Sequence, residues 1–164
     1  MRIEPIPPRP GQESVWDYPR PPRLEGSPKR IRILVGGETI VDSVGTKRVL
    51  ETSHPPVYYI PPEDIRMDLL LPSPRKSWCE WKGTARYFSL QVGDDLLEDV
   101  AWTYPSPVPA FEPIRDHVAF YPSRMDQCYV DHELARAQEG DFYGGWITSD
   151  IVGPFKGEAG TRGW

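Results

Sequence analysis

Apolar and polar side chains alternate along much of the chain from residue 30 onward. In the segment 30–35 (RIRILV) every second residue from Ile31 is apolar, and the segment 38–43 (ETIVDS) follows after Gly36 and Gly37. Two glycines between alternating segments supply the positive φ angles that a tight hairpin needs. The pattern therefore predicts an antiparallel hairpin, the clearest in the sequence.

Further strands are predicted where short alternating or β-branched segments are bounded by turn residues. They cover 47–52, 57–60, 84–92, 99–105, 117–122 and 127–135. One or two short helical turns are expected, near 62–65, where proline precedes two acidic residues, and near 113–116. No helical pattern exceeds about two turns. The predicted fold class is therefore mainly β, a compact antiparallel twisted sheet or small barrel.

The composition divides the chain into one core and two arms. Residues 1–28 hold eight of the twenty prolines and lack periodicity, so we expect an extended N-terminal arm. Residues 29–135 contain the predicted strands and form the β domain. Residues 136–164 are rich in glycine and in aromatic side chains that a solvated linker does not use. We expect this C-terminal arm to pack on the core.

Charge and hydropathy exclude several classes of function. The net charge of −5 disfavours nucleic-acid binding, and the sequence has neither a span of ~18 apolar residues nor an apolar leader. We therefore expect a cytoplasmic protein without a membrane partner. The two cysteines and three histidines do not cluster, so no metal and no cofactor is expected. The phosphate-binding glycine loops and paired carboxylates of nucleotide enzymes are also missing.

Cys79 and Lys82 lie three residues apart, with Gly83 next, in the stretch SWCEWKGTARYFSL (77–90). A bend at the glycine would bring the lysine amine near the thiol and favour the thiolate, which makes Cys79 a candidate nucleophile. The alternative is a small buried cysteine beside a lysine at a strand end. No local motif supplies a catalytic histidine, and this favours the alternative.

Arg48 and Glu51 lie on one predicted strand beside Val49 and Leu50. Their side chains point to opposite faces, so at least one charge faces a covered side. A buried charge needs a partner, and a ligand pocket is one place where it finds one. A solvated edge strand is the alternative.

Aromatic side chains at strand positions complete the candidate site, either as core residues or as the lining of a pocket. They are Tyr59, Tyr87, Trp102 and Tyr104. The leading hypothesis is a small-molecule pocket in which Arg48 or Lys82 holds an anionic group, Glu51 accepts hydrogen bonds and the tyrosines orient the ligand. One alternative is a transferase or redox enzyme that uses Cys79 and Lys82. Another is an interaction module that forms a homodimer through its arms.

Several longer motifs carry a family resemblance. They are VWDYPRPPRLE, KRVLETSHPPVYYIPPEDI, WCEWKGTARYFSL, VAWTYPSP, HVAFYPSRM and GDFYGGWITSDIVGPFKGEAGTRGW. In order and spacing the chain resembles the bacterial family known as domain of unknown function 427, which also carries a nucleotidyltransferase-like label. The family's usual Cys-Pro-Tyr-Lys-Gly is Cys79-Glu80-Trp81-Lys82-Gly83 here, so the cysteine, lysine and glycine match.

The resemblance implies a fold more than a reaction. It implies a compact antiparallel β domain similar to the Mss4-like or β-tent group, which includes methionine sulfoxide reductase domains and the thalidomide-binding domain of cereblon. Relatives in that group often hold a zinc ion with four cysteines, and this chain has two. Matched positions of the family pattern are Arg48, Glu51, Tyr59, Cys79, Lys82, Tyr87, Trp102 and Tyr104.

Overall fold

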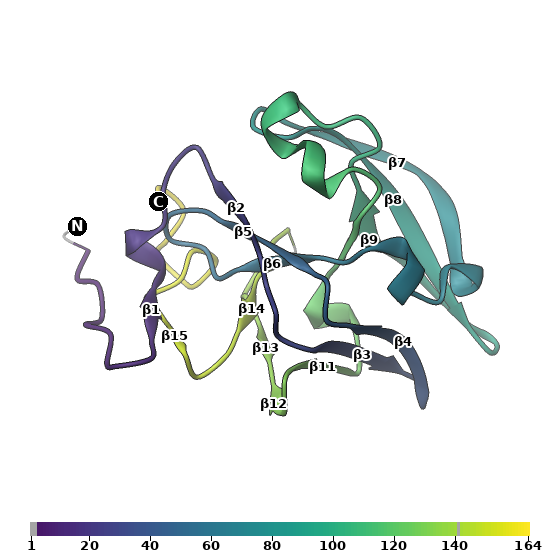
Figure 1. Cartoon of the computed structure of the whole chain (residues 1–164), viewed down its shortest axis with the longest axis horizontal. Coiled ribbons are helices and arrows are strands. Elements are labelled where there is room, and N and C mark those ends of the chain that lie inside the picture. The colour runs from purple at the N-terminus through teal and green to yellow at the C-terminus, as the bar shows by residue number, and fades with distance from the viewer. Residues whose placement is uncertain (1–2, 141) are drawn as a thin grey trace.

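Short antiparallel sheets joined by tight turns make up the chain in a computed structural model that describes residues 3–140 and 142–164 (Figure 1). Strands hold 45% of the residues and helices 11%. The helices are 3-10 turns: η1 (Val15–Asp17), η2 (Pro62–Asp64), η3 (Met67–Leu69), η4 (Pro109–Ile114) and η5 (Pro122–Arg124). The prediction of a mainly β fold is confirmed. Among the described residues the strands form several sheets and do not close into a barrel. The Mss4-like architecture stays a prediction.

The sheet that carries most of the site is four-stranded, in the order β10-β9-β8-β7. Its strands are β7 (Leu70–Cys79), β8 (Gly83–Val92), β9 (Asp95–Thr103) and β10 (Val118–Phe120). The alternation of apolar residues predicted β8. The sequence did not predict β7, because Pro72 and Pro74 interrupt the pattern. An edge strand tolerates such prolines, and the pairing with β8 does shift in register between Pro72 and Lys76.

Because of a second register shift, side chains of β8 pack into two different hydrophobic clusters. The shift lies between Phe88 and Leu90, where β8 pairs with β9. Before it, Ala85 and Tyr87 pack into an aromatic cluster, and after it Leu90 packs into the main aliphatic core. Such a bulge moves a strand's buried side chains to the other face. It therefore separates the aromatic cluster from the aliphatic core.

Two further sheets hold the rest of the core. One has the order β12-β11-β3-β4, and the other β2-β5-β6. Their strands are β2 (Arg23–Gly26), β3 (Ile31–Val35), β4 (Glu38–Ser43), β5 (Lys47–Leu50), β6 (Val57–Tyr59), β11 (Gln127–Val130) and β12 (Glu133–Leu134). Strands β3 and β4 form the hairpin that alternation predicted, with Gly36 and Gly37 at positive φ. Strand β2 lies within the segment that we expected to be an extended arm.

The two arms meet at one end of the molecule (Figure 1). One short ladder joins them there, between β1 (Glu13–Ser14) and β15 (Ile151–Val152), and a second lies within the C-terminal arm, between β13 (Arg136–Ala137) and β14 (Trp146–Ile147). Strands β1 and β15 pair in parallel, whereas β13 and β14 are antiparallel. The indole nitrogen of Trp16 donates to the carbonyl of Pro154 at 2.9 Å, and the Trp16 ring meets Trp164 edge to face at 5.1 Å.

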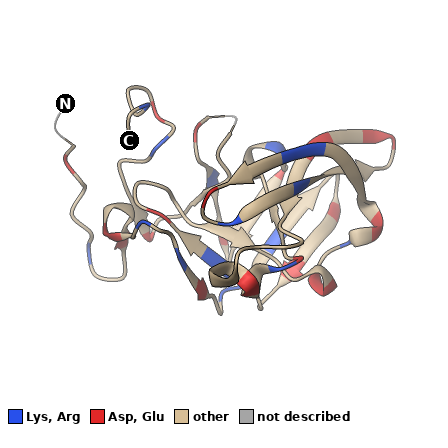
Figure 2. Cartoon of the chain, turned by 90° about the horizontal axis from the view of Figure 1, so that it is seen from above, with Lys and Arg blue, Asp and Glu red and all other residues tan. Residues whose placement is uncertain are grey.

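Charged side chains of both signs are interspersed along the ribbon rather than gathered on one face (Figure 2). Within the described ranges, no helix is long and apolar enough to cross a bilayer. The cytoplasmic location and the homodimer through the arms stay predictions.

Candidate functional site

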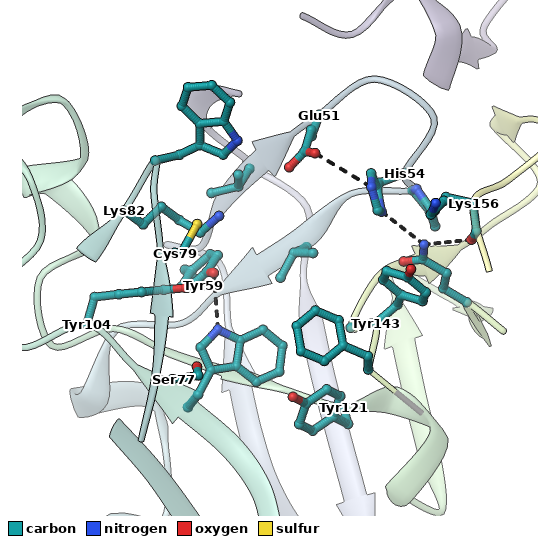
Figure 3. Close-up of a pocket in the computed structure, with 18 of the residues that line it drawn as sticks. Glu51, His54, Tyr59, Ser77, Cys79, Lys82, Tyr104, Tyr121, Tyr143 and Lys156 are labelled. Atoms are coloured by element: carbon teal, nitrogen blue, oxygen red, sulfur yellow. Dashed lines mark hydrogen bonds and ion pairs between the residues drawn. The ribbon is translucent and has the colours of Figure 1, made fainter. Parts of the chain in front are cut away.

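A cavity of about 680 Å³ lies over the aromatic cluster (Figure 3). Three parts of the chain surround it: the segment after β5, the tip of the β7–β8 hairpin and the C-terminal arm. It contains seven of the eight residues that the sequence singled out. They are Glu51, Tyr59, Cys79, Lys82, Tyr87, Trp102 and Tyr104. We refer to it as the aromatic cavity.

Packed rings form the floor of the aromatic cavity. Trp102 of β9 lies 4.6 Å from Tyr121 between ring centroids and 6.3 Å from Tyr59, which it meets edge to face. Its indole nitrogen donates to the Tyr59 hydroxyl at 3.2 Å. Tyr87, the cross-strand partner of Trp102, shares a 2.9 Å hydrogen bond with the Ser77 hydroxyl. The floor is therefore apolar in its faces and carries polar groups only at ring edges.

Burial keeps the phenols of this floor protonated. It raises the pKa of Tyr59, of Tyr104 and of Tyr121 well above the usual value of about 10. Each hydroxyl therefore stays a neutral group near neutral pH. The floor supplies hydrogen-bonding capacity without a negative charge, so it does not repel an anion.

Lys82 occupies the tip of the β7–β8 hairpin and is 9% exposed. Gly83, at φ +112°, closes the turn, and the carbonyl of Lys82 accepts the N–H of Val108 at 3.0 Å. These contacts hold the tip against the loop before η4. The ammonium lies 5.8 Å from the ring centroid of Phe111 and 5.9 Å from that of Tyr104. Within residues 3–140 and 142–164, it makes no hydrogen bond or ion pair.

A polar wall faces the rings, built on the turn after β5. The Glu51 carboxylate lies 3.3 Å from Nε of Arg20 and 3.6 Å from Nε2 of His54. On the other side of the imidazole, Nδ1 lies 3.1 Å from the side-chain nitrogen of Gln138. That nitrogen also donates to the carbonyl of Lys156 at 2.8 Å.

The hydrogen bonds around Gln138 assign the tautomer of His54. The N–H of Gly145 donates to Oε1 of Gln138 at 3.1 Å, so the amide nitrogen of Gln138 is the group that faces His54. Nδ1 of His54 therefore accepts, and Nε2 carries the proton toward Glu51. Burial lowers the pKa of His54, and the positive charges of Arg20, Lys156 and Lys82 lower it further against the opposing effect of Glu51. In the neutral form Nδ1 is therefore engaged by Gln138, whereas the 3.6 Å distance from Nε2 to Glu51 is longer than a hydrogen bond.

The C-terminal arm closes the cavity opposite the hairpin, with Tyr143 and Lys156 across from Cys79 and Lys82 (Figure 3). The ammonium of Lys156 donates to the backbone oxygens of Thr161, Arg162 and Trp164 at 2.8, 2.9 and 3.2 Å. All three of its donors are satisfied. Lys156 therefore fixes the end of the arm.

The structure places Arg48 away from the aromatic cavity. Its guanidinium donates two hydrogen bonds to Glu13, at 2.9 and 3.1 Å, and contacts the carboxylate of Glu25, its cross-strand neighbour on β2. Two carboxylates already neutralise it. Our expectation that Arg48 could hold a ligand's anionic group is therefore not supported by its position. Within the described residues, Lys82 is the lining cation whose side chain makes no hydrogen bond or ion pair.

The sequence did not single out several residues that line the cavity. They are Arg20, His54, Ser77, Gln138, Tyr143 and Lys156. Most come from the two arms or from turns, where no periodicity marks a face. The one available signal was the concentration of aromatic residues in the C-terminal arm, which predicted packing but not the cavity wall.

The charges that line the aromatic cavity sum to a positive excess. Three lining residues are cationic (Arg20, Lys82, Lys156) and two are anionic (Glu51, Glu80). The chain as a whole has a net charge of −5. Among the described residues, no three His, Cys, Asp or Glu side chains gather closely enough to hold a metal ion. The lining of the cavity is therefore more positive than the chain as a whole.

A family profile matches the chain from residue 23 to residue 131, which is more than half of its length. The family is described as Domain of unknown function (DUF427), with the short label NTP_transf_9. No curated protein matches the chain. The matched range includes the rings and the hairpin, whereas Arg20 and the wall formed by the C-terminal arm lie outside it.

Proposed function

Since the chain belongs to the family described as domain of unknown function 427, and this membership names no activity, we propose a function from the site itself. The aromatic cavity binds a small organic anion, whose charged group is held by Lys82. The aromatic floor accepts the apolar part of the ligand. The polar wall around Glu51 accepts hydrogen bonds from the ligand's donors.

One observation carries this proposal: the Lys82 side chain is largely buried among rings, and its ammonium, which keeps some contact with solvent, has no acceptor among the described residues. Partial removal of an ammonium group from water costs free energy unless another charge or several hydrogen bonds replace the lost water. Phe111 and Tyr104 offer a weak cation–π contact, worth roughly 0.5–2 kcal/mol. An anionic ligand would supply the missing partner. This explains why the hairpin holds an amine at this point.

The size and the lining of the cavity support the same proposal. Small-molecule sites measure about 300–1,000 Å³ and combine apolar walls with a few polar groups. The aromatic cavity has about 680 Å³ and fits that description. The excess of positive over negative side chains in its lining adds a preference for anions over neutral molecules.

The experiment compares charged ligands with neutral ligands of the same shape. The probes are 2-naphthoate against 2-naphthamide, and adenosine 5′-monophosphate against adenosine, titrated by calorimetry. The variant Lys82→Met removes the charge, and Lys76→Met removes an exposed lysine from the same hairpin outside the cavity. Charge-assisted hydrogen bonds contribute roughly 1.5–3 kcal/mol. We expect at least one anion to bind roughly tenfold or more tightly than its neutral partner.

That preference should persist in Lys76→Met and disappear in Lys82→Met. If Lys82→Met keeps the preference, or if neither anion binds the unmodified protein at millimolar concentration, the proposal is wrong. The two ligand pairs also separate sources of the anion. Naphthoate presents a carboxylate, whereas the nucleotide presents a phosphate of the kind that the family's label suggests.

A second candidate function uses Cys79 as a nucleophile. Its support is that Cys79 is half-buried and lines the aromatic cavity, whereas Cys128 is buried in the aliphatic core, where burial raises its pKa to about 12. His54 lines the same cavity, yet its accepting nitrogen Nδ1 already receives the amide of Gln138, which disfavours it as a base. Iodoacetamide tests this candidate. A Cys79 that alkylates no faster than a free thiol would contradict it.

A further inference from the structure

The imidazole of His54 holds a second donor without an acceptor in the lining of the aromatic cavity. Nδ1 receives the amide of Gln138 at 3.1 Å, so the proton of the neutral ring lies on Nε2. The carboxylate of Glu51 is 3.6 Å from Nε2, beyond hydrogen-bond distance, and residues 3–140 and 142–164 supply no other acceptor for it. Nε2 keeps some contact with solvent. A ligand in the cavity can therefore reach this N–H.

The direction of this donor is fixed before any ligand binds. Gln138 is 2% exposed, and its amide nitrogen also donates to the carbonyl of Lys156 at 2.8 Å. The backbone N–H of His54 donates to the carbonyl of Glu51 at 3.0 Å. The ring of Tyr143 lies 5.5 Å from the imidazole between centroids. Because the imidazole is held on several sides, binding at Nε2 costs little ordering.

An acceptor lies directly beside this donor. Figure 3 shows the Glu51 carboxylate facing His54. The oxygen of Glu51 that faces His54 also contacts Nε of Arg20 at 3.3 Å, whereas its other oxygen, Oε1, receives no hydrogen bond within the described ranges. The wall thus presents an N–H next to a carboxylate. A ligand edge that complements this pair has an acceptor next to a donor, as a primary carboxamide or an aminopurine has.

This pair and Lys82 act on the same space. All three side chains line the aromatic cavity. The positive charge of Lys82 is also one of the charges that lower the pKa of His54, so the two groups lie near enough to interact electrostatically.

We propose that Nε2–H of His54 donates a hydrogen bond to an acceptor on the ligand, and that Glu51 accepts one from a neighbouring donor. The ligand class is then an organic anion that carries a carboxamide-like edge away from its charged group. The inference rests on the proposed function and specifies the second polar group of its ligand. Carboxylates and phosphates share this chemistry, and the experiment distinguishes them.

The test compares anions that differ in one polar group. 4-Carbamoylbenzoate has the acceptor and the donor, 4-acetylbenzoate keeps the acceptor alone, and 4-isopropylbenzoate has neither. The 3-substituted isomers cover a shorter spacing, and the corresponding phenyl phosphates replace the carboxylate by a phosphate. Calorimetry measures each affinity. One neutral hydrogen bond changes affinity by roughly threefold to tenfold.

Two variants of His54 separate the roles of its nitrogens. Asparagine has its amide at the δ position, so His54→Asn keeps an acceptor for Gln138 and loses the donor at Nε2. Glutamine has its amide at the ε position, so His54→Gln keeps a donor there. His132→Gln is the matched control, because His132 is exposed and lies outside the cavity.

In the unmodified protein and in His132→Gln, the acetyl ligand of at least one series should bind roughly threefold or more tightly than the isopropyl ligand. The carbamoyl ligand should bind more tightly again. The advantage of the acetyl ligand should disappear in His54→Asn and persist in His54→Gln. A two-bond ¹H–¹⁵N correlation spectrum of the unmodified protein should show the His54 proton on Nε2, which needs no variant to fold for the binding study.

Three results would overturn the role of His54 while the anion site stands, provided that Lys82→Met abolishes anion preference. They are an acetyl ligand without advantage in the unmodified protein, an advantage that His54→Asn keeps, and a neutral ring protonated on Nδ1. If Lys82→Met leaves anion preference in place, the proposed function fails and this inference fails with it.

Discussion

Lys82 and Lys156 lie in the same cavity but differ in the contacts that their ammonium groups make. Both line the aromatic cavity, and both are 9% exposed. The ammonium of Lys156 donates to three backbone oxygens of the chain's own end, at 2.8 to 3.2 Å. The ammonium of Lys82 has two ring faces near 6 Å and, in the described part of the chain, no acceptor. The two lysines are therefore equally buried, but their ammonium groups have different hydrogen-bonding environments.

The difference separates a structural cation from a functional one. Burial of a charge costs free energy in both places, and hydrogen bonds offset that cost when they replace the lost water. Lys156 meets this condition within the protein, so its charge stabilises the fold of the arm. Under the proposed function, Lys82 would meet it when an anionic ligand binds. The four predictions below test this contrast, from the largest expected effect to the smallest.

Lys156→Met should cause the largest loss of stability. The substitution leaves three backbone oxygens without their donor, and at least the one on Thr161 is buried. Each unsatisfied buried group costs about 1–3 kcal/mol. Because the arm can rearrange to hydrate part of the site, we expect the free energy of unfolding to fall by about 3 kcal/mol, measured by urea denaturation. A loss below about 1 kcal/mol would contradict the structural role of Lys156.

Arg48→Met should cost less and leave binding intact. The guanidinium joins Glu13 of the N-terminal arm to Glu25 of β2, but both carboxylates are more than a third exposed and water can hydrate them. Solvent screening therefore reduces the loss to about 1–2 kcal/mol. Affinity for the anionic probes should stay within about twofold of the unmodified protein. A large drop in affinity would mean that Arg48, not Lys82 alone, holds the anion.

The contacts of Arg48 and His54 show which parts of the structure the sequence could predict. Local alternation predicted the β3–β4 hairpin and β8, because the residues that decide those elements are adjacent in the chain. It did not predict that Glu13 would pair with Arg48, 35 residues later, or that Gln138 would contact His54, 84 residues earlier. Neither contact has a spacing that could mark it. Both depend on where the arms pack.

The candidate site could likewise be predicted only where its residues lie in short, recognisable stretches of the sequence. Tyr87, Trp102 and Tyr104 lie at strand positions, and the hairpin stretch places Cys79 and Lys82 beside a glycine. These residues meet in one cavity. The opposite wall could not be predicted, since the C-terminal arm has aromatic residues without periodicity. Strand β7 was missed because Pro72 and Pro74 conceal an edge strand.

His54 makes stability depend on pH. Its pKa is lowered in the folded protein, so the unfolded chain binds the proton more tightly and stability is complete above the unfolded pKa of about 6.5. As pH falls from there through the lower folded pKa, the free energy of unfolding should decrease by about 1 kcal/mol. His54→Gln should flatten this change in urea titrations at several pH values. An unchanged profile would show that His54 does not titrate in this window.

Lys82→Met should have the smallest effect on stability, and its sign should differ from that of Lys156→Met. The substitution removes a buried charge that has no carboxylate partner in the described residues, which favours the folded state, and it removes a weak cation–π contact, which opposes it. The two effects nearly cancel, so we expect a gain of less than about 1 kcal/mol in urea denaturation. A loss of about 2 kcal/mol or more would mean that the protein itself satisfies Lys82. The amine would then be structural, as in Lys156, and the contrast between the two lysines would fail.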